Sequence, residues 1–191
     1  MSSSPPISNN GRFDRRTEAL IGLADDPPVM SVGTPHRSGT NATEPDAAVP
    51  TQVYTIGYQG RTLSEVLRVV QVHSIQQVLD VRENAMSRKP GFTSAELKQA
   101  LETIDVAYVH LPELGCSAEV RRALWRGAPS GPVLEDYRRG LTARPQAFWD
   151  LVHRAGSARS LLLCMERDPS RCHRAVLAER LRIEGVTVED L

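Results

Sequence analysis

The fold of this 191-residue chain is decided by residues 161–174, LLLCMERDPSRCHR. The apolar run Leu161–Leu163 predicts a buried strand that ends at Cys164, and the charged loop after it leads through Asp168 and Pro169 into a helix. In an α/β protein, ligands bind where a strand ends and the next helix starts. The stretch therefore predicts an α/β fold with a functional site, because thiols, a carboxylate, an imidazole and a guanidinium are concentrated there.

The chain before this stretch repeats the same alternation of short apolar strands and amphipathic helices. Strands are expected at 53–56, 77–81, 107–109, 160–164 and 186–188. Helices are expected at 62–70, 93–104, 145–156 and 170–184, and in pieces over 117–140 with a break at 127–132. This order predicts a three-layer, Rossmann-like α/β sandwich with a mostly parallel sheet of about five strands.

The first 50 residues differ from the rest. They hold seven of the 13 prolines and many Ser, Thr, Asn and Asp residues, without sustained hydrophobic periodicity. Such a segment cannot bury enough apolar surface to offset the entropy lost on ordering. The sequence therefore predicts a disordered N-terminal arm over residues 1–50 and an α/β domain over residues 51–191.

Charge and cysteine content indicate the surroundings of the protein. The 23 basic and 23 acidic side chains balance, so the overall charge favours neither a nucleic-acid nor a membrane partner. No apolar stretch approaches the roughly 18 residues of a membrane span, and no secretory leader is recognised. Three cysteines without a leader indicate a reducing compartment. We expect a cytoplasmic protein with no membrane partner.

The strongest catalytic candidates lie between the fourth strand and the last helix. Cys164, at the strand end, is expected to be a thiolate of lowered pKa, with Glu166, Cys172 and His173 as catalytic companions. Arg174 begins the inner face of the last helix, where Glu166 or an anionic ligand would be its partner. The alternative is that Cys164 is a buried core thiol and Cys172 a small apolar filler.

A zinc site is the other chemistry that these residue types allow. Donor atoms are present in Cys116, Cys164, Cys172 and His173, but their spacing matches no standard zinc finger or ribbon. Cys172 and His173, adjacent on one helix, would also point in different directions. The sequence therefore predicts no metal site and no cofactor.

A second polar cluster follows the second strand. Asp80 and Arg82 lie at its end, and Arg88 and Lys89 follow in a loop that turns at Pro-Gly. This arrangement favours an anion-binding lip on the same edge of the sheet as Cys164. The alternative is a solvated loop with a structural ion pair between Asp80 and Arg82.

Two further segments supply candidate ligand-binding residues. His110 and Glu113 follow the third strand, and Gly57 and Tyr58 precede the first helix. A glycine there permits close approach of the backbone to a ligand. The alternatives are a structural histidine and an ordinary glycine turn.

Five short motifs follow one another along the chain: TIGY (55–58), DVR (80–82), SRKPGF (87–92), HLPELG (110–115), and LCME with CHR (163–174). Together they resemble the DUF488 family, a bacterial and archaeal group, over residues 53–190. The resemblance implies a Rossmann-like α/β domain whose paired cysteines are suspected of catalysis. Many members of the family carry His-Ser where this chain has Tyr58-Gln59.

The leading hypothesis is a thiol-dependent enzyme, a hydrolase or transferase, acting on an anionic nucleotide or nucleic-acid component. Cys164 would be the nucleophile, Glu166 a general acid or base, and His173 an assistant in proton transfer. The cations expected to hold the anion are Arg82, Arg88, Lys89 and Arg174.

Two alternatives belong to other classes of protein. One is a non-catalytic module that binds a nucleotide or nucleic acid, although few aromatic residues are available for base stacking. The other is a redox switch between Cys164 and Cys172. A rhodanese-like or phosphatase loop is disfavoured because Glu166 and Asp168 would repel a persulfide or phosphate.

Overall fold

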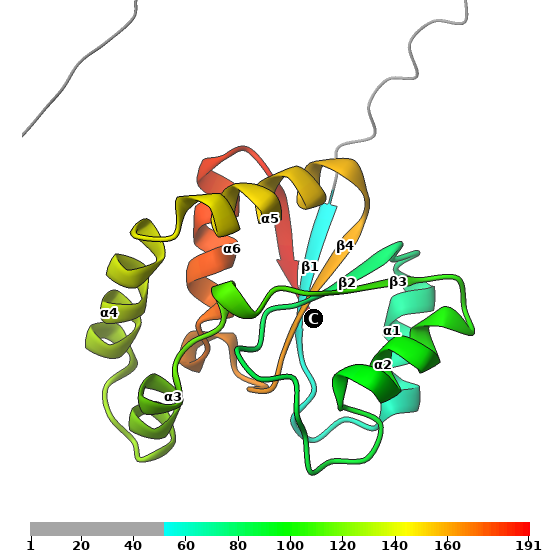
Figure 1. Ribbon diagram of the computed structural model, residues 1–191, viewed down its shortest axis with the longest axis horizontal. Helices are drawn as coiled ribbons and strands as arrows, with labels where there is room; N and C mark the ends of the chain where they lie inside the picture. The colour runs from blue at the N-terminus through cyan, green and yellow to red at the C-terminus, as the bar shows by residue number, and fades with distance from the viewer. Residues whose placement is uncertain (1–51) are drawn as a thin grey trace, which may run out of the picture. The chain divides into compact units, whose positions relative to one another are not determined.

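The computed structural model describes residues 52–191, in which five strands form a single parallel sheet of order β3-β2-β4-β1-β5 (Figure 1). The strands are β1 (Gln52–Gly57), β2 (Gln77–Asp80), β3 (Ala107–His110), β4 (Ser160–Cys164) and β5 (Thr187–Asp190). Every strand pair is parallel. The predicted α/β fold is confirmed, whereas the predicted disordered arm over residues 1–50 lies outside the described residues.

Helices cover both faces of the sheet (Figure 1). One face packs against α1 (Leu63–Val72) and α2 (Ser94–Glu102). The other packs against α3 (Ala118–Trp125), α4 (Ser130–Thr142), α5 (Pro145–Ser157) and α6 (Arg174–Ile183). Each face has its own apolar cluster, so the three predicted layers are present. No helix within residues 52–191 has the length and hydropathy needed to cross a membrane.

Strand β4 is the middle strand of the sheet and is buried along its whole length. Its side chains alternate between the two faces, as strand geometry requires. Leu161 and Leu163 join the apolar cluster with α1 and α2, whereas Leu162 and Cys164 join the cluster with α3 to α6. Cys164 therefore lies at the centre of the carboxyl edge, on the side of α6.

The first two helices begin as the sequence predicts. At α1 the Thr62 hydroxyl accepts a hydrogen bond from the Glu65 amide, and the Glu65 carboxylate accepts one from the Thr62 amide. Thr93 and Glu96 form the same capping box at α2. These reciprocal bonds satisfy backbone donors that the first helical turn leaves free.

The start of the last helix differs from the prediction. Asp168 caps only a short 3₁₀ turn, Pro169–Arg171, which is closed by hydrogen bonds from Arg171 to Asp168 and from Cys172 to Pro169. Cys172 then has extended backbone angles, with φ −135° and ψ 140°, and α6 starts at Arg174. Cys172 is therefore not a helical residue.

The predicted break at 127–132 is also shorter in the structure. Helix α4 begins at Ser130, so Gly131 and Pro132 belong to its first turn. A proline is tolerated there because the first-turn amides have no partner within the helix.

Candidate functional site

A pocket of about 670 Å³ opens at the carboxyl edge of the sheet. Its walls come from the loops after β1, β2 and β4 and from helix α3. The lining residues are Tyr58, Gln59, Gly60, Arg82, Glu83, Asn84, Met86, Ser87, Arg88, Lys89, Arg121, Trp125, Cys164, Met165, Glu166 and His173. The second and fourth strands thus deliver their polar loops to one place, as expected from their parallel arrangement.

Two thiols and one carboxylate lie together at the pocket, which Cys164 and Glu166 line and which Cys172 adjoins through Glu166. Cys164 is 2% exposed, and its Sγ donates to Glu166 Oε2 over 3.0 Å. Cys172, on the extended segment before α6, donates to the same oxygen over 3.2 Å. A single carboxylate oxygen therefore joins both sulfur atoms.

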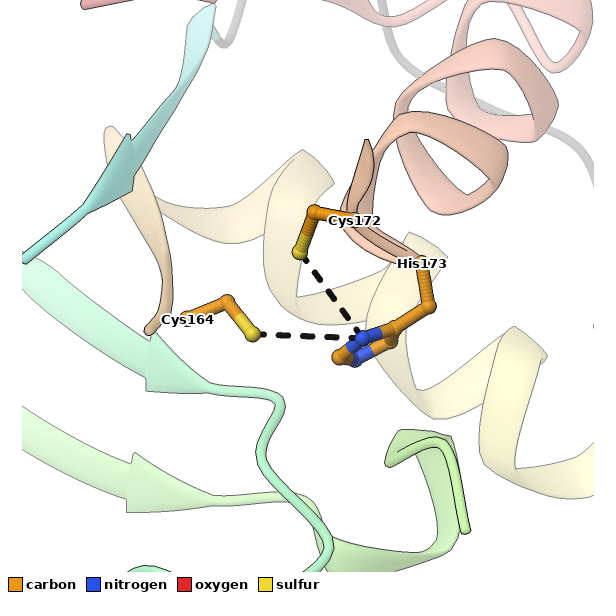
Figure 2. Close-up of side chains that lie close together, drawn as sticks. All are labelled: Cys164, Cys172 and His173. Atoms are coloured by element: carbon orange, nitrogen blue, oxygen red, sulfur yellow. Dashed lines mark hydrogen bonds between the residues drawn. The ribbon is translucent and has the colours of Figure 1, made fainter. Parts of the chain in front are cut away.

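The orientation of His173 is fixed from the far side of its ring. Its Nε2 lies 2.8 Å from the carbonyl oxygen of Val81, which can only accept, so Nε2 carries a hydrogen. Nδ1 faces the two sulfur atoms, at 3.9 Å from Cys164 Sγ and 3.8 Å from Cys172 Sγ (Figure 2). The expectation that Cys172 and His173 point in different directions is wrong, because the extended backbone at Cys172 turns both side chains to one point.

The pKa of Cys164 is raised, not lowered as expected. Its interaction with Cys172 lowers the pKa, but burial and the adjacent Glu166 carboxylate outweigh that effect. Arg174 donates to the Thr55 hydroxyl and to backbone oxygens, not to the Cys164 sulfur. Cys164 therefore rests as a thiol.

Glu166 is ready to accept a proton. Burial raises its pKa, but hydrogen bonds from Cys164, from its own backbone and from Cys172, together with the charge of His173, more than compensate. The net shift is downward, so the carboxylate is ionised at neutral pH. Burial lowers the pKa of His173, but its interactions with Cys172 and Cys116 raise it well above the usual value.

The cluster after β2 is structural, as the alternative interpretation holds. Arg82, 5% exposed, pairs with the fully buried Asp80 over 2.5 Å. Its other donors reach the Tyr58 hydroxyl at 3.1 Å and the Phe92 carbonyl at 2.9 Å. Tyr108 donates to Asp80 over 2.7 Å. Four of the five donors of Arg82 are therefore used within the protein, although the residue also lines the pocket.

Arg174 is also structural. It is 1% exposed and does not line the pocket. Its guanidinium donates to the Thr55 hydroxyl and to the carbonyl oxygens of Glu166 and Arg167. Glu166 is thus a partner of Arg174, as the sequence predicts, but the contact is made by its backbone carbonyl and not by its carboxylate. Arg174 fixes the loop that carries Glu166.

Arg88 and Lys89 remain at the pocket rim, where the sequence predicts an anion-binding lip. Arg88 is exposed and has no hydrogen-bonding or salt-bridge partner among residues 52–191. Lys89 donates to the Tyr58 carbonyl over 3.1 Å and lies 5.2 Å from the centre of the Phe92 ring. Arg88 is therefore the more available cation.

Three predicted ligand-binding residues lie outside the pocket lining. His110 Nε2 bonds to the Arg82 carbonyl at 2.8 Å, and the Glu113 carbonyl accepts from Arg144. A Cβ at Gly57 would overlap the Glu166 carbonyl, so this glycine permits approach of the neighbouring loop and not of a ligand. Tyr58 does line the pocket, and its ring stacks on Phe92.

Helix α3 contributes two residues that the sequence analysis missed. Arg121 donates to Glu83 over 3.2 Å and to the Cys116 carbonyl over 2.7 Å, and Trp125 is 58% exposed beside it at the rim. Their i, i+4 spacing places them on one helix face and was a usable signal. The sequence did not indicate that α3 approaches the sheet edge. Although the chain has few aromatic residues, Trp125 and Tyr58 both line the pocket.

The comparisons with known proteins identify one family. A family model described as DUF488, "Domain of unknown function DUF488", matches residues 62–181, more than half of the chain. No match was found among curated proteins or among solved structures.

Proposed function

The chain belongs to the DUF488 family, and from that premise and the geometry of its site we propose that it is a thiol-dependent hydrolase or transferase acting on an anionic, nucleotide-like substrate. The position of Cys164 carries the proposal. Its Sγ lies on the floor of an open pocket, 3.0 Å from a carboxylate oxygen of Glu166. A nucleophile within hydrogen-bond reach of a base, at the floor of a pocket, is typical of covalent catalysis.

The proposed reaction has two balanced steps. Cys164 Sγ bonds to the electrophilic atom of the substrate while its proton passes to Glu166. The bond to the leaving group breaks, and the leaving group takes the proton from Glu166. Water, or an acceptor hydroxyl, then displaces the sulfur and gives its proton to Glu166, which passes it to the departing Cys164 thiolate and so restores both the thiol and the carboxylate. Activation occurs during attack, which suits a thiol of raised pKa beside an ionised carboxylate.

The rim supports an anionic, aromatic substrate. Arg88, Lys89 and Arg121 bring positive charge to the pocket, where Glu83 is the opposing rim carboxylate. Trp125 offers an exposed ring on which a nucleobase can stack. The volume of about 670 Å³ lies within the range of small-molecule sites.

The test is labelling of the reduced protein with iodoacetamide, with each cysteine followed by mass spectrometry. Cys116 is a control within the chain, because it is also 2% exposed but does not line the pocket. We expect Cys164 to react at least tenfold faster than Cys116, and millimolar adenosine monophosphate to slow the labelling of Cys164 alone. If both stay inert until the protein unfolds, Cys164 is a core thiol and the proposal fails.

A non-catalytic nucleotide-binding module would use the same rim. It predicts that Cys164→Ser binds the nucleotide as the unaltered protein does and that no covalent adduct forms on Cys164. The enzyme proposal predicts an adduct at Cys164, detected as added mass after acid quench of a nucleotide-derivative screen. The proposal also implies a reducing cytoplasmic location, because the nucleophile must remain a free thiol.

A further inference from the structure

The side chains of Cys164, Cys172 and His173 point toward one another, so that their donor atoms lie close together (Figure 2). The two sulfur atoms and Nδ1 all lie within 4.8 Å of one another. We propose that these three side chains form a binding site for a single Zn²⁺ ion. Two thiolates with one imidazole are a donor set that zinc prefers.

The sulfur–nitrogen distances are close to those around a tetrahedral zinc ion. Zinc bonds of 2.3 Å to sulfur and 2.0–2.1 Å to nitrogen place neighbouring S and N donors about 3.6 Å apart. The corresponding distances here are 3.9 Å from Cys164 Sγ and 3.8 Å from Cys172 Sγ to Nδ1. Side-chain adjustments of about 0.3 Å therefore bring each sulfur–nitrogen distance to the value expected around zinc.

His173 provides the second, independent observation. The ring is 1% exposed, and its Nε2–H donates to the Val81 carbonyl. When Nδ1 gives up its proton, its lone pair is directed at the two sulfurs, which lie 3.9 and 3.8 Å away. Metal-binding histidines are oriented in this way by a backbone carbonyl on the opposite nitrogen.

The segments that carry the donors are fixed before an ion arrives. Arg174 holds the carbonyls of Glu166 and Arg167 next to Thr55, and the 3₁₀ turn sets the extended conformation of Cys172. Little conformational entropy remains to be lost on binding. The donor set is thus preorganised.

A fourth coordination position faces Glu166 and the pocket. Glu166 Oε2 lies 3.0 and 3.2 Å from the two sulfurs, and Cys164, Glu166 and His173 all line the pocket, which gives the ion a route from solvent. When Zn²⁺ binds, each thiol becomes a thiolate and Nδ1 of His173 is unprotonated, so the protons that these three groups carry leave to solvent.

Zinc binding would regulate the site. This part of the inference rests on the proposed function: a Cys164 sulfur bonded to zinc cannot attack a substrate or an alkylating agent. The metal-free form is then the reactive one, and the zinc-bound form is masked.

The test uses the full chain, reduced and stripped of metal, titrated with Co²⁺ and then with Zn²⁺. We expect one equivalent of Co²⁺ to produce thiolate-to-cobalt charge-transfer absorption and one equivalent of Zn²⁺ to abolish it. Mg²⁺ should have no effect, because it prefers oxygen donors. A folded protein that gives no such absorption overturns the inference.

Variants identify the ligands. Cys164→Ser, Cys172→Ser and His173→Gln should each weaken Zn²⁺ binding by about 100-fold or more, judged by competition with a chromophoric chelator. Cys116→Ser is the matched control and should bind as before, since this buried thiol lies outside the donor set. Equal binding by all four variants contradicts the site.

The unaltered protein gives a readout that does not depend on how variants fold. Zn²⁺ should suppress alkylation of Cys164 and Cys172 and leave the rate at Cys116 unchanged. Zinc binding with an inert metal-free Cys164 would refute the proposed function and retain the metal site. A reactive Cys164 without zinc binding would refute the metal site alone.

Discussion

Two buried polar clusters lie side by side at the carboxyl edge of the sheet, after the neighbouring strands β2 and β4. The Asp80 cluster comprises Asp80, Arg82, Tyr58 and Tyr108, and the Cys164 cluster comprises Cys164, Glu166, Cys172 and His173. In the Asp80 cluster every charged group has close partners, including an ion pair at 2.5 Å. In the Cys164 cluster the sulfur–imidazole contacts are 3.8 and 3.9 Å.

This difference in pairing distinguishes a cluster that stabilises the fold from a cluster that is available for chemistry. Burying a charge costs free energy that only complete pairing offsets, and the Asp80 cluster meets that condition. In the Cys164 cluster an imidazole nitrogen lies 3.9 and 3.8 Å from two polarisable sulfurs beside a pocket, through which another molecule or ion can reach them. Close packing alone does not distinguish polar groups that bind a ligand from polar groups that stabilise the fold. The two kinds of cluster differ in whether their donor and acceptor atoms already have close partners within the protein.

The largest expected effect is at Asp80. Arg82→Met leaves the Asp80 carboxylate buried without its cation and should lower the free energy of unfolding by about 3–5 kcal/mol, measured by urea denaturation. Arg139→Met, which removes an exposed ion pair with Asp136, is the control and should cost about 0–1 kcal/mol. Equal costs for the two variants would mean that the Asp80 cluster is not a structural support.

The second effect tests whether the loop that carries Glu166 needs the space that Gly57 leaves for it. Gly57→Ala places a methyl group against the Glu166 carbonyl and should destabilise the protein by about 1–3 kcal/mol. Gly140→Ala, inside α4 with an ordinary contact to Arg144, should instead stabilise it by about 0.5–1 kcal/mol. Thermal unfolding of both variants measures the contrast. A neutral Gly57→Ala would show that the loop after β4 can move away freely.

A smaller effect is expected within the Cys164 cluster itself. Cys172→Ala removes one hydrogen bond to Glu166 and should cost about 1 kcal/mol in urea denaturation, because no charge loses its only partner. Cys116→Ala, at another buried cysteine, is the comparison. If Cys172→Ala lowered the free energy of unfolding as much as Arg82→Met does, the Cys164 cluster would be a structural support like the Asp80 cluster.

The smallest effect provides a baseline from an exposed carboxylate. Hydrogen bonds from the Thr62 amide and hydroxyl lower the pKa of Glu65 below its usual value of 4.5. Because the folded pKa is lower than the unfolded one, the carboxylate stabilises the fold above the unfolded pKa, and this contribution is lost as pH falls through the folded pKa. Urea denaturation over a pH series should show a small stability difference from Glu65→Gln that shrinks below pH 4.5. A difference independent of pH contradicts the capping role of the charge.

The sequence predicts local structure well where the cause is local. Alternating strands and helices and both capping boxes follow from neighbouring residues, and so does the placement of Cys164 at a strand end. The predicted helical start at Asp168 and Pro169 failed for a tertiary reason, since Cys172 is drawn into an extended segment beside Glu166.

The Asp80–Arg82 ion pair was an alternative that the sequence offered, whereas the further partners of the arginines could not be predicted from spacing. Arg82 and Arg174 are directed at partners far along the chain or at backbone oxygens, whereas Arg121 and Trp125 reach the pocket only because α3 is carried to the sheet edge. The convergence of Cys172 and His173 depends on two backbone angles at Cys172 that no short-range pattern specifies. Whether a cationic side chain is available to a ligand depends on the partners that the fold brings to it, and not on its residue type.

The position of β4 has a consequence for synthesis of the protein on the ribosome. β1 and β2 do not touch each other, and the strand that joins them, Ser160–Cys164, is made only after both have left the ribosome. The bond from Arg174 to Thr55 spans 119 positions and closes later still. In the nascent chain β1 and β2 therefore lack their common neighbour until β4, which lies late in the sequence, has emerged. A chain that ends before Ser160 lacks the central strand of the sheet together with Cys164 and Cys172.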